Sequence, residues 1–208
     1  NKRIVFAHLA YWHYSSQSEN KKINHHNAVD AISKLLLARK EVTEYTMAHD
    51  RAVKFLEYAE RRSIYFEDNF THKTFLEYYA ADHLYITYFT KARDSERYAL
   101  LGIIKKYLSN SFWYIVFELV LTRIDKEQSD NQVMDEIIDT QLATESLNAN
   151  YFIIMNMRNF VNISDSLRQQ TLKRTMALLV RGERHSSVSA SGMELDDNNL
   201  LYKLCNHQ

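Results

Sequence analysis

The segment "SIYFEDNFTH", from Ser63 to His72, decides how the first third of this chain folds. Two short runs of β-favouring residues flank "EDN", and both Asp68 and Asn69 tolerate the backbone of a tight turn. The segment therefore predicts a small β-hairpin with Asp68 and Asn69 at its turn. His72 follows the hairpin directly, at the point where the apolar period of a helix begins.

Three helices are predicted before this hairpin, because apolar residues recur there at helical spacing. The first covers residues 3–14, the second follows Asn24, and the third runs from Thr46 to Arg62. The side chains predicted to face inward are Ile4, Phe6, Leu9 and Trp12 in the first helix, Val29, Ile32, Leu35 and Leu36 in the second, and Ala52, Phe55, Leu56 and Ala59 in the third. Three helices followed by a hairpin predict a winged-helix-like domain over residues 1–72.

The remainder of the chain is predicted to form antiparallel helical hairpins over residues 73–182, followed by a flexible link and a short C-terminal helix over 183–208. Helices are expected from Lys73, from Asp94 or Ser95, over residues 109–124, and over 130–147, 150–161 and 164–180. Predicted interior residues are Phe75, Tyr78, Tyr79, Ile86 and Phe89, then Leu100, Leu101, Ile104 and Leu108, then Phe112, Trp113, Ile115 and Leu119. The predicted fold class is therefore mainly α, with one small β-hairpin and a repeat-like helical region.

The composition excludes several classes of function. The chain has no proline and 3 glycines, which favours helices with short polar turns and leaves no glycine-rich loop for binding phosphate or a dinucleotide. Its formal net charge is zero, so no overall field attracts nucleic acid or an anionic membrane. Cys205 is the single cysteine, which rules out a disulfide within the chain and predicts a cytoplasmic location.

Neither a signal peptide nor a membrane span is predicted. The longest apolar run, from Phe112 to Leu121, is too short to cross a bilayer and contains Glu118, so we expect a core helix and no membrane partner. The chain begins at Asn1 without a methionine, which leads us to expect a piece of a longer protein.

Metal and hydrolase motifs are weak. "AHD", from Ala48 to Asp50, has the His-Asp order of metal-dependent phosphohydrolases, but Asp82-His83 is the nearest candidate for further ligands. "HHN" at residues 25–27 lacks ligands at helical spacing, and no zinc-protease motif occurs. We therefore expect no metal site and no catalytic residues.

The stretch "FTHKTFLEYYAA", from Phe70 to Ala81, resembles the F-x-H-x-S/T-F-Q-E-Y/F-F-A-A signature of NACHT-type STAND NTPases, the family of NOD-like receptors and their bacterial relatives. Leu76 in place of the usual Gln is the chief departure. "HLAYWHYSSQSENKKIN" and "FLEYAERRSIYF" are similar to the segments that precede this signature in bacterial members, so the resemblance covers roughly residues 3–90.

This resemblance implies a role for His72. In the family, a winged-helix domain closes over an upstream nucleotide-binding domain, and the histidine of the signature contacts the β-phosphate of ADP. The expected partners are then that upstream domain and a protein or other trigger at the helical region. ADP or ATP with Mg²⁺ is expected in the parent protein, and no cofactor in residues 1–208 alone. The resemblance also implies signalling in antiviral defence. Glu77 itself is expected to have a structural role, through bonds to the hairpin backbone, because such a residue is more often part of the core than a ligand.

A DNA-binding regulator built on the same winged helix is the alternative. The candidate recognition helix carries Arg51, Lys54, Arg61 and Arg62, but Asp50, Glu57 and Glu60 offset them. The hairpin tip "EDN" is acidic where a contact to phosphate needs Lys or Arg. Nucleic acid is therefore a poor candidate partner.

The isolated chain is predicted not to hydrolyse ATP, because no P-loop is present to hold the triphosphate and its Mg²⁺. Phosphate release by the purified chain should equal that of a buffer blank. Hydrolysis that persists through successive purification steps would contradict this prediction.

Overall fold

The computed structural model describes residues 2–89, 94–127, 132–142 and 146–180. Over these residues the chain is mainly helical with one small antiparallel hairpin, which confirms the predicted fold class. The elements are α1 (Lys2–Ser18), α2 (His25–Ala38), α3 (Tyr45–Arg61), β1 (Tyr65–Phe66), β2 (Asn69–Phe70), α4 (Lys73–Tyr88), α5 (Asp94–Tyr107), η1 (Ser111–Trp113), α6 (Tyr114–Glu127), α7 (Gln132–Leu142), α8 (Leu147–Asn156), η2 (Met157–Asn159) and α9 (Asp165–Val180), where η marks a 3₁₀ turn.

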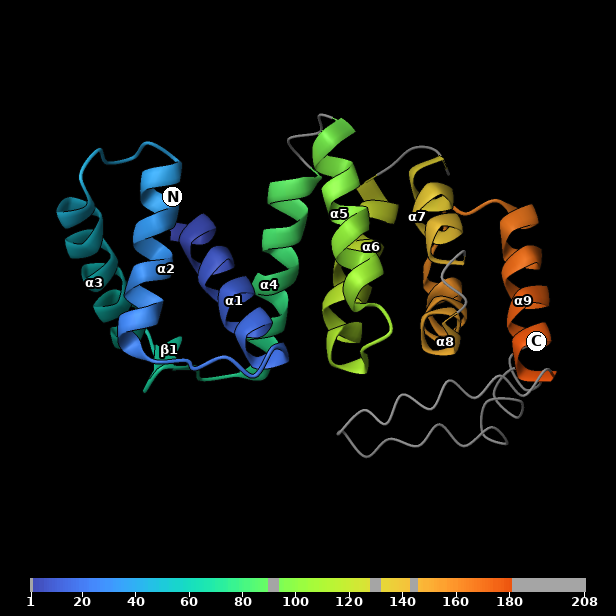
Figure 1. Cartoon of the computed structure of the whole chain (residues 1–208), viewed down its shortest axis with the longest axis horizontal. Coiled ribbons are helices and arrows are strands. Elements are labelled where there is room, and N and C mark those ends of the chain that lie inside the picture. The colour runs from blue at the N-terminus through green and yellow to red at the C-terminus, as the bar shows by residue number, and fades with distance from the viewer. Residues whose placement is uncertain (1, 90–93, 128–131, 143–145, 181–208) are drawn as a thin grey trace.

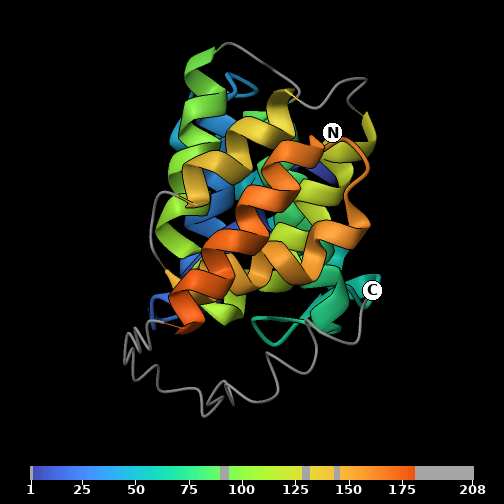
Figure 2. The same cartoon turned by 90° about the vertical axis from the view of Figure 1, so that its right-hand side faces the viewer.

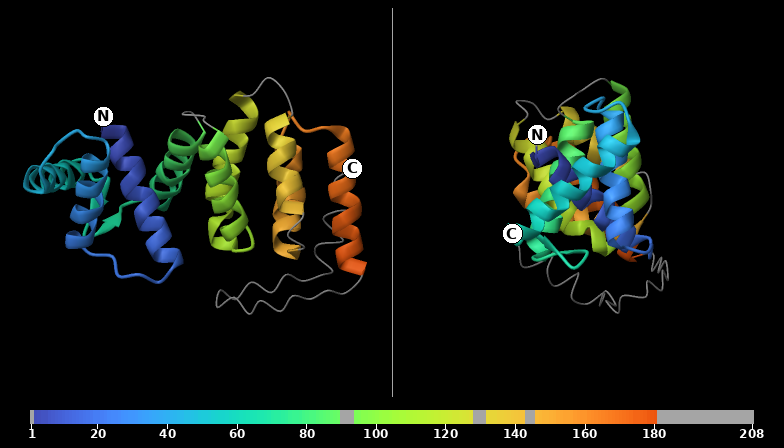
Figure 3. Two further views of the ribbon diagram at one scale, coloured as in Figure 1. Left: turned by 45° about the horizontal axis from the view of Figure 1, so that its top comes forward. Right: turned by 90° about the vertical axis from the view of Figure 1, so that its left-hand side faces the viewer.

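The helices stand side by side in a row in the order α3, α2, α1 and α4, followed by α5 with α6, α7 with α8, and α9 (Figure 1, and Figure 3, left). The hairpin lies below α2 and α3, and α9 closes the opposite end, where it covers the helices behind it (Figure 2). α4 sits in the middle and packs on α1 on one side and on α5 and α6 on the other. Buried apolar residues from α1 to α9 form one continuous cluster, so the row shares a single core.

The predicted division of the chain at residues 72 and 73 falls at the start of α4. It stays a prediction, and so does the short C-terminal helix, because residues 181–208 lie outside the described part of the chain.

The three predicted N-terminal helices are present. Asn24 is the N-cap of α2, where its side-chain oxygen accepts a hydrogen bond of 2.9 Å from the backbone N–H of Asn27. Most of the residues predicted to face inward are buried, and Ile4, Trp12, Leu35 and Phe55 are only partly so. Apolar periodicity therefore located these helices to within a few residues of their ends.

The hairpin forms as predicted, but its turn lies one residue earlier. Tyr65 pairs with Phe70 and Phe66 pairs with Asn69, so the two central residues are Glu67 and Asp68. Both have positive φ, 47° and 61°, as a two-residue turn requires when it matches the twist of its strands. Asn69 belongs to β2, and its side chain donates a hydrogen bond to the Glu67 carbonyl.

The predicted interior faces of α4 and α6 need correction. Phe75 and Tyr78 on α4, and Ile115 and Leu119 on α6, are exposed. α4 instead turns Leu76, Ala80, Ala81 and Leu84 inward, because small residues allow it to approach α1 closely. The first turns of α6 are apolar all round, so periodicity alone could not select the buried face, which contains Val116, Phe117, Val120, Leu121 and Ile124.

Two predicted helix boundaries in the C-terminal half are also wrong. The stretch predicted as one helix over 130–147 contains the end of α7 at Leu142, and α8 starts at Leu147 after its cap, Ser146. α8 then stops at Asn156, well before the predicted end at Val161. The chain leaves the helix there because Asp125 on α6 accepts hydrogen bonds of 2.7 Å from the backbone N–H groups of Val161 and Asn162. Residue 130, the predicted start, lies outside the described ranges.

Trp113 is a buried side chain that joins α1 to α5 and α6. It is completely buried, and its ring packs against Tyr14 of α1, Tyr107 of α5 and Phe117 of α6. Its indole N–H donates a 2.8 Å hydrogen bond to the Ser18 hydroxyl at the end of α1. A buried indole with its N–H satisfied contributes both apolar contact and orientation.

Replacing Trp113 with Ala should lower the free energy of unfolding by about 3–5 kcal/mol, the usual cost of truncating a buried aromatic side chain. Leu119→Ala on the exposed side of α6 is the matched control and should cost less than about 1 kcal/mol. Chemical denaturation followed by circular dichroism measures both. Equal stability of the two variants would show that Trp113 does not hold α1 against α5 and α6.

Candidate functional site

His72, the one site residue predicted from the sequence, occupies the N-cap of α4 directly after the hairpin. Its backbone is extended, with φ −130° and ψ 129°, and its carbonyl accepts hydrogen bonds from the N–H groups of Phe75 and Leu76. Its side chain is exposed and makes no capping hydrogen bond. The ring meets the edge of Phe75, with 5.4 Å between centroids. The backbone of His72 is thus held while its imidazole faces solvent.

Thr71 ties the position of His72 to the base of the hairpin. The Thr71 hydroxyl donates a 2.6 Å hydrogen bond to the Ser63 carbonyl, and the Thr71 N–H donates one of 3.1 Å to the Ile64 carbonyl. These two bonds close the hairpin one residue before His72. As a result, these two hydrogen bonds set the approach of the chain to α4.

His13 of α1 packs against the inner side of the hairpin. It is completely buried, and its ring packs edge-on against Tyr65 and Phe70, which point inward from the two strands. Its Nε2 lies 3.1 Å from the Gln17 amide, whereas its Nδ1 has no hydrogen-bond partner among the described residues. Burial lowers the pKa of His13 to about 4, against a weaker opposing pull from Asp68.

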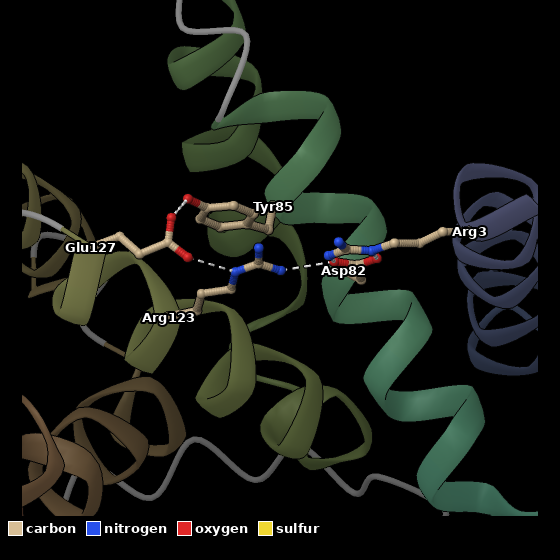
Figure 4. A network of polar contacts seen from close by, with 5 residues as sticks. All are labelled: Arg3, Asp82, Tyr85, Arg123 and Glu127. Carbon is tan, nitrogen blue, oxygen red and sulfur yellow. Dashed lines mark hydrogen bonds and ion pairs between the residues drawn. The ribbon is translucent and has the colours of Figure 1, made fainter. Parts of the chain in front are cut away.

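Asp82 is the most enclosed charge near this site. Its carboxylate is almost fully buried between Arg3 of α1 and Arg123 of α6 (Figure 4). Arg3 donates from Nε at 2.8 Å and from Nη2 at 2.5 Å, and Arg123 donates from Nη1 at 2.8 Å. Three helices therefore meet at one carboxylate, nearly three turns along α4 from His72.

Arg123 also carries a second set of contacts on the other side of Asp82. Its Nε donates a 3.0 Å hydrogen bond to Glu127, its guanidinium lies 3.7 Å from the centre of the Tyr85 ring, and the Tyr85 hydroxyl donates to Glu127 (Figure 4). A planar guanidinium suits this arrangement because it can stack on a ring and donate along its edges at once. Arg123 thus positions α6 against α4.

The charges of this network set the direction of its pH response. Burial alone would raise the pKa of Asp82, but the hydrogen bonds from Arg3 and Arg123 outweigh it and hold the pKa below its ordinary value. A carboxyl whose pKa is lower in the folded state stabilises the fold above its unfolded pKa. Asp82 therefore contributes at neutral pH, and its contribution is lost only as the pH falls through its folded pKa.

Glu77, predicted to bond to the hairpin backbone, is buried on α4 and forms an ion pair of 3.4 Å with Lys73 one turn earlier. No hydrogen bond joins it to the hairpin in the described part of the structure. Lys73 itself is exposed beside His72 and adds a positive charge at the start of α4.

The residues considered for a metal site do not come together. His49 and Asp50 lie on the surface of α3, while Asp82 and His83 lie within the α1–α4 contact, with Asp82 bound by its two arginines. Within the described ranges, no group of three or more His, Cys, Asp or Glu side chains is placed to hold a metal ion.

The positive charges of the candidate DNA-reading helix, α3, are partly engaged within the chain. Arg62, just after α3, lies 5.6 Å from the centre of the Tyr58 ring, and Lys2 of α1 lies 3.6 Å from the same ring. Arg51 donates to the Glu41 carbonyl. No feature of this face favours the DNA-binding alternative.

Sequence reasoning missed most of the polar residues that hold this region. Arg3 and Arg123 are separated by 120 positions and follow no motif, and His13 reads as one more residue of an aromatic helix. The only signal for Asp82 was a carboxylate on the inward half of a helix with apolar neighbours. Its partners became visible only in the fold.

Neither models of known protein families, nor curated proteins, nor solved structures match this chain. Among its described helices, none combines the length and apolar character needed to cross a membrane.

The stability of the chain should fall between pH 6.5 and pH 4, because unfolded His13 takes up a proton in this range and folded His13 does not. A pKa lowered from 6.5 to about 4 corresponds to roughly 3 kcal/mol, at about 1.4 kcal/mol per unit. Burial lowers the pKa of His8 as well, which adds to the loss in the same direction. Urea unfolding at pH 7 and at pH 4 measures the difference.

His13→Phe should remove most of the His13 share of this loss, because a phenyl ring fits between the same two aromatic rings and takes up no proton. His26→Gln on the exposed surface of α2 is the control and should lose as much stability as the unmodified chain. If His13→Phe lost just as much between the two pH values, His13 would not be the group that titrates.

Proposed function

We propose that this chain is a non-catalytic regulatory segment of a NACHT-type STAND NTPase, in which His72 binds the β-phosphate of ADP and holds the parent protein at rest. The observation that carries the proposal is the placement of His72 in the sequence signature and in space. The signature histidine is presented on a fixed backbone at the start of α4, with its imidazole exposed and free of a capping bond.

The chemistry around His72 suits a phosphate. An imidazole N–H donated to a phosphate oxygen is a charge-assisted hydrogen bond. The first N–H groups of α4 have no partner within the helix, and the positive end of the helix dipole lies at the same place. Lys73 adds a cation at the next position. His72 would therefore contact the phosphate, while the start of α4 and Lys73 would favour its negative charge.

The proposed switch follows from where the nucleotide binds. The upstream domain of the parent would hold ADP or ATP with Mg²⁺, and residues 1–72 would close over the ADP form through His72. Exchange of ADP for ATP would break this contact, so that the hairpin and its helices swing away. The helical region after α4 would receive the trigger, a protein or another ligand, in the cytoplasm, and antiviral defence is the proposed setting.

His72→Ala in the parent protein should weaken ADP retention and raise basal signalling, because only the resting state loses a bond. A hydrogen bond to a charged group contributes roughly 1.5–3 kcal/mol, which shifts the ratio of closed to open protein about 10- to 100-fold. The ADP that copurifies with the protein, measured by chromatography, and the basal output of the parent are the two readouts.

Two further variants sharpen this test. His72→Gln keeps an N–H donor at a similar reach and should retain more ADP than His72→Ala, whereas His49→Ala, which changes a partly exposed histidine on α3, should behave as the unmodified parent. The 208-residue chain carrying His72→Ala should unfold at the unmodified temperature. Normal ADP retention together with a less stable chain would show that His72 is structural. Separately, salt-sensitive binding of the chain to random duplex DNA would favour the DNA-binding alternative.

A further inference from the structure

Four apolar side chains with interior character in the sequence face solvent on two neighbouring helices. Phe75 and Tyr78 on α4 are 42% and 50% exposed, and Ile115 and Leu119 on α6 are 46% and 39% exposed. Single exposed apolar residues are ordinary on a protein surface, but a contiguous group of them commonly marks an interaction site.

The contacts drawn in Figure 4 fix the register of α4 and α6, from which the relative positions of the four residues follow. Asp82 meets Arg123, and three residues further along α4 Tyr85 meets Glu127, so α4 and α6 run in the same direction in a fixed register. One turn earlier on each helix, this register places Tyr78 beside Leu119, and the turn before that places Phe75 level with Ile115. We call these four residues the α4–α6 strip.

The end of the α4–α6 strip nearest to Asp82 is positively charged. The side chains of Arg3 and Arg123 are 49% and 33% exposed, whereas the Asp82 carboxylate between them is 1% exposed, so water meets the guanidinium groups and not the acid. Lys126, one turn beyond Arg123, is also exposed. Glu127 opposes them but is paired with Arg123. Arg3 binds Asp82 through Nε and Nη2, which leaves its Nη1 for an outside acceptor. Arg123 uses Nε and Nη1 and also contacts Tyr85, so it offers an outside acceptor its positive charge.

The size of the strip indicates what kind of occupant fits. A whole aromatic side chain has a surface of about 150–250 Å². Four side chains exposed to this degree therefore offer roughly 350 Å² of apolar surface to a partner. A stable dimer of folded proteins buries about 800 Å² on each partner, so the strip alone is too small to hold a second copy of this chain. It is wide enough for one helix, whose anchors repeat every three or four residues.

We propose that the α4–α6 strip docks one amphipathic helix of a partner protein, with apolar residues against the strip and carboxylates one to two turns further along. The apolar residues of this helix cover Phe75, Tyr78, Ile115 and Leu119. Its carboxylates accept a hydrogen bond from Arg3 and meet the positive charges of Arg123 and Lys126. This inference does not depend on the nucleotide role of His72.

Selection from a library of random 16-residue helical peptides, displayed against the immobilised 208-residue chain, tests the proposal without a known partner. The enriched peptides should share apolar residues at i, i+3 or i+4, and i+7, followed by Asp or Glu. Synthetic copies of the enriched peptides should bind at least about tenfold more weakly to Leu119→Ser and to Tyr78→Ser, the loss expected for a central apolar anchor. Their affinity should fall with added salt and in Lys126→Ala, because carboxylates contribute to binding.

Leu172→Ser, which removes an equally exposed leucine from α9, is the matched control and should bind the peptides as the unmodified chain does. Melting curves verify that each variant is folded. The proposal is overturned if no peptide is enriched, if the enriched peptides are basic or bind all variants equally, or if sedimentation shows self-association that Leu119→Ser abolishes. Binding to anionic vesicles that depends on the strip would likewise overturn it in favour of a lipid surface.

Discussion

The carboxylate of Asp82 is the constraint on which the arrangement of the helices depends. A charge so fully removed from water is costly unless other charges compensate it, and here two guanidinium groups from distant parts of the chain do so. Arg3 and Arg123 can reach Asp82 together only when α1 and α6 flank α4, so one buried acid selects the order of three helices. Both arginines keep part of their side chains in water, and their bonds to carboxylates outweigh the desolvation of their charges, which favours a net stabilising network.

Carboxylates also hold the two ends of one connection in the C-terminal half, between η2 and α9. Asp125 on α6 accepts two backbone N–H groups from the segment that follows η2, and Asp135 on α7 accepts that of Ser164 before α9. Backbone groups in a connection need partners when they are buried, and a carboxylate satisfies two of them with strong bonds. Apolar burial supplies the continuous core, while Asp125 and Asp135 fix the course of the connection between η2 and α9.

The N-terminal region combines a rigid base with an exposed tip. His13 and the inward rings of Tyr65 and Phe70 hold the hairpin on α1, and Thr71 closes it one residue before His72. A side chain that must meet a ligand from another domain gains affinity when its backbone is already ordered, since less entropy is lost on binding. The proposed phosphate contact and the proposed docking strip both lie on α4, which also carries Asp82, so one helix would link the two surfaces.

The sequence by itself determined most of the helices and the location of the hairpin, because both depend on local patterns: apolar spacing for the helices, the Asn24 cap, and turn residues between two β-favouring runs. It also singled out His72, through a motif of contiguous residues. It did not determine which side of an apolar helix is buried. Phe75, Tyr78, Ile115 and Leu119 carry as much apolar character as their buried neighbours, and only the positions of α1 and α5 relative to α4 and α6 leave them in solvent. The end of α8 and the pairing of Arg3 with Asp82 were likewise decided by the tertiary structure, because the groups that determine them lie on elements that only folding brings into contact.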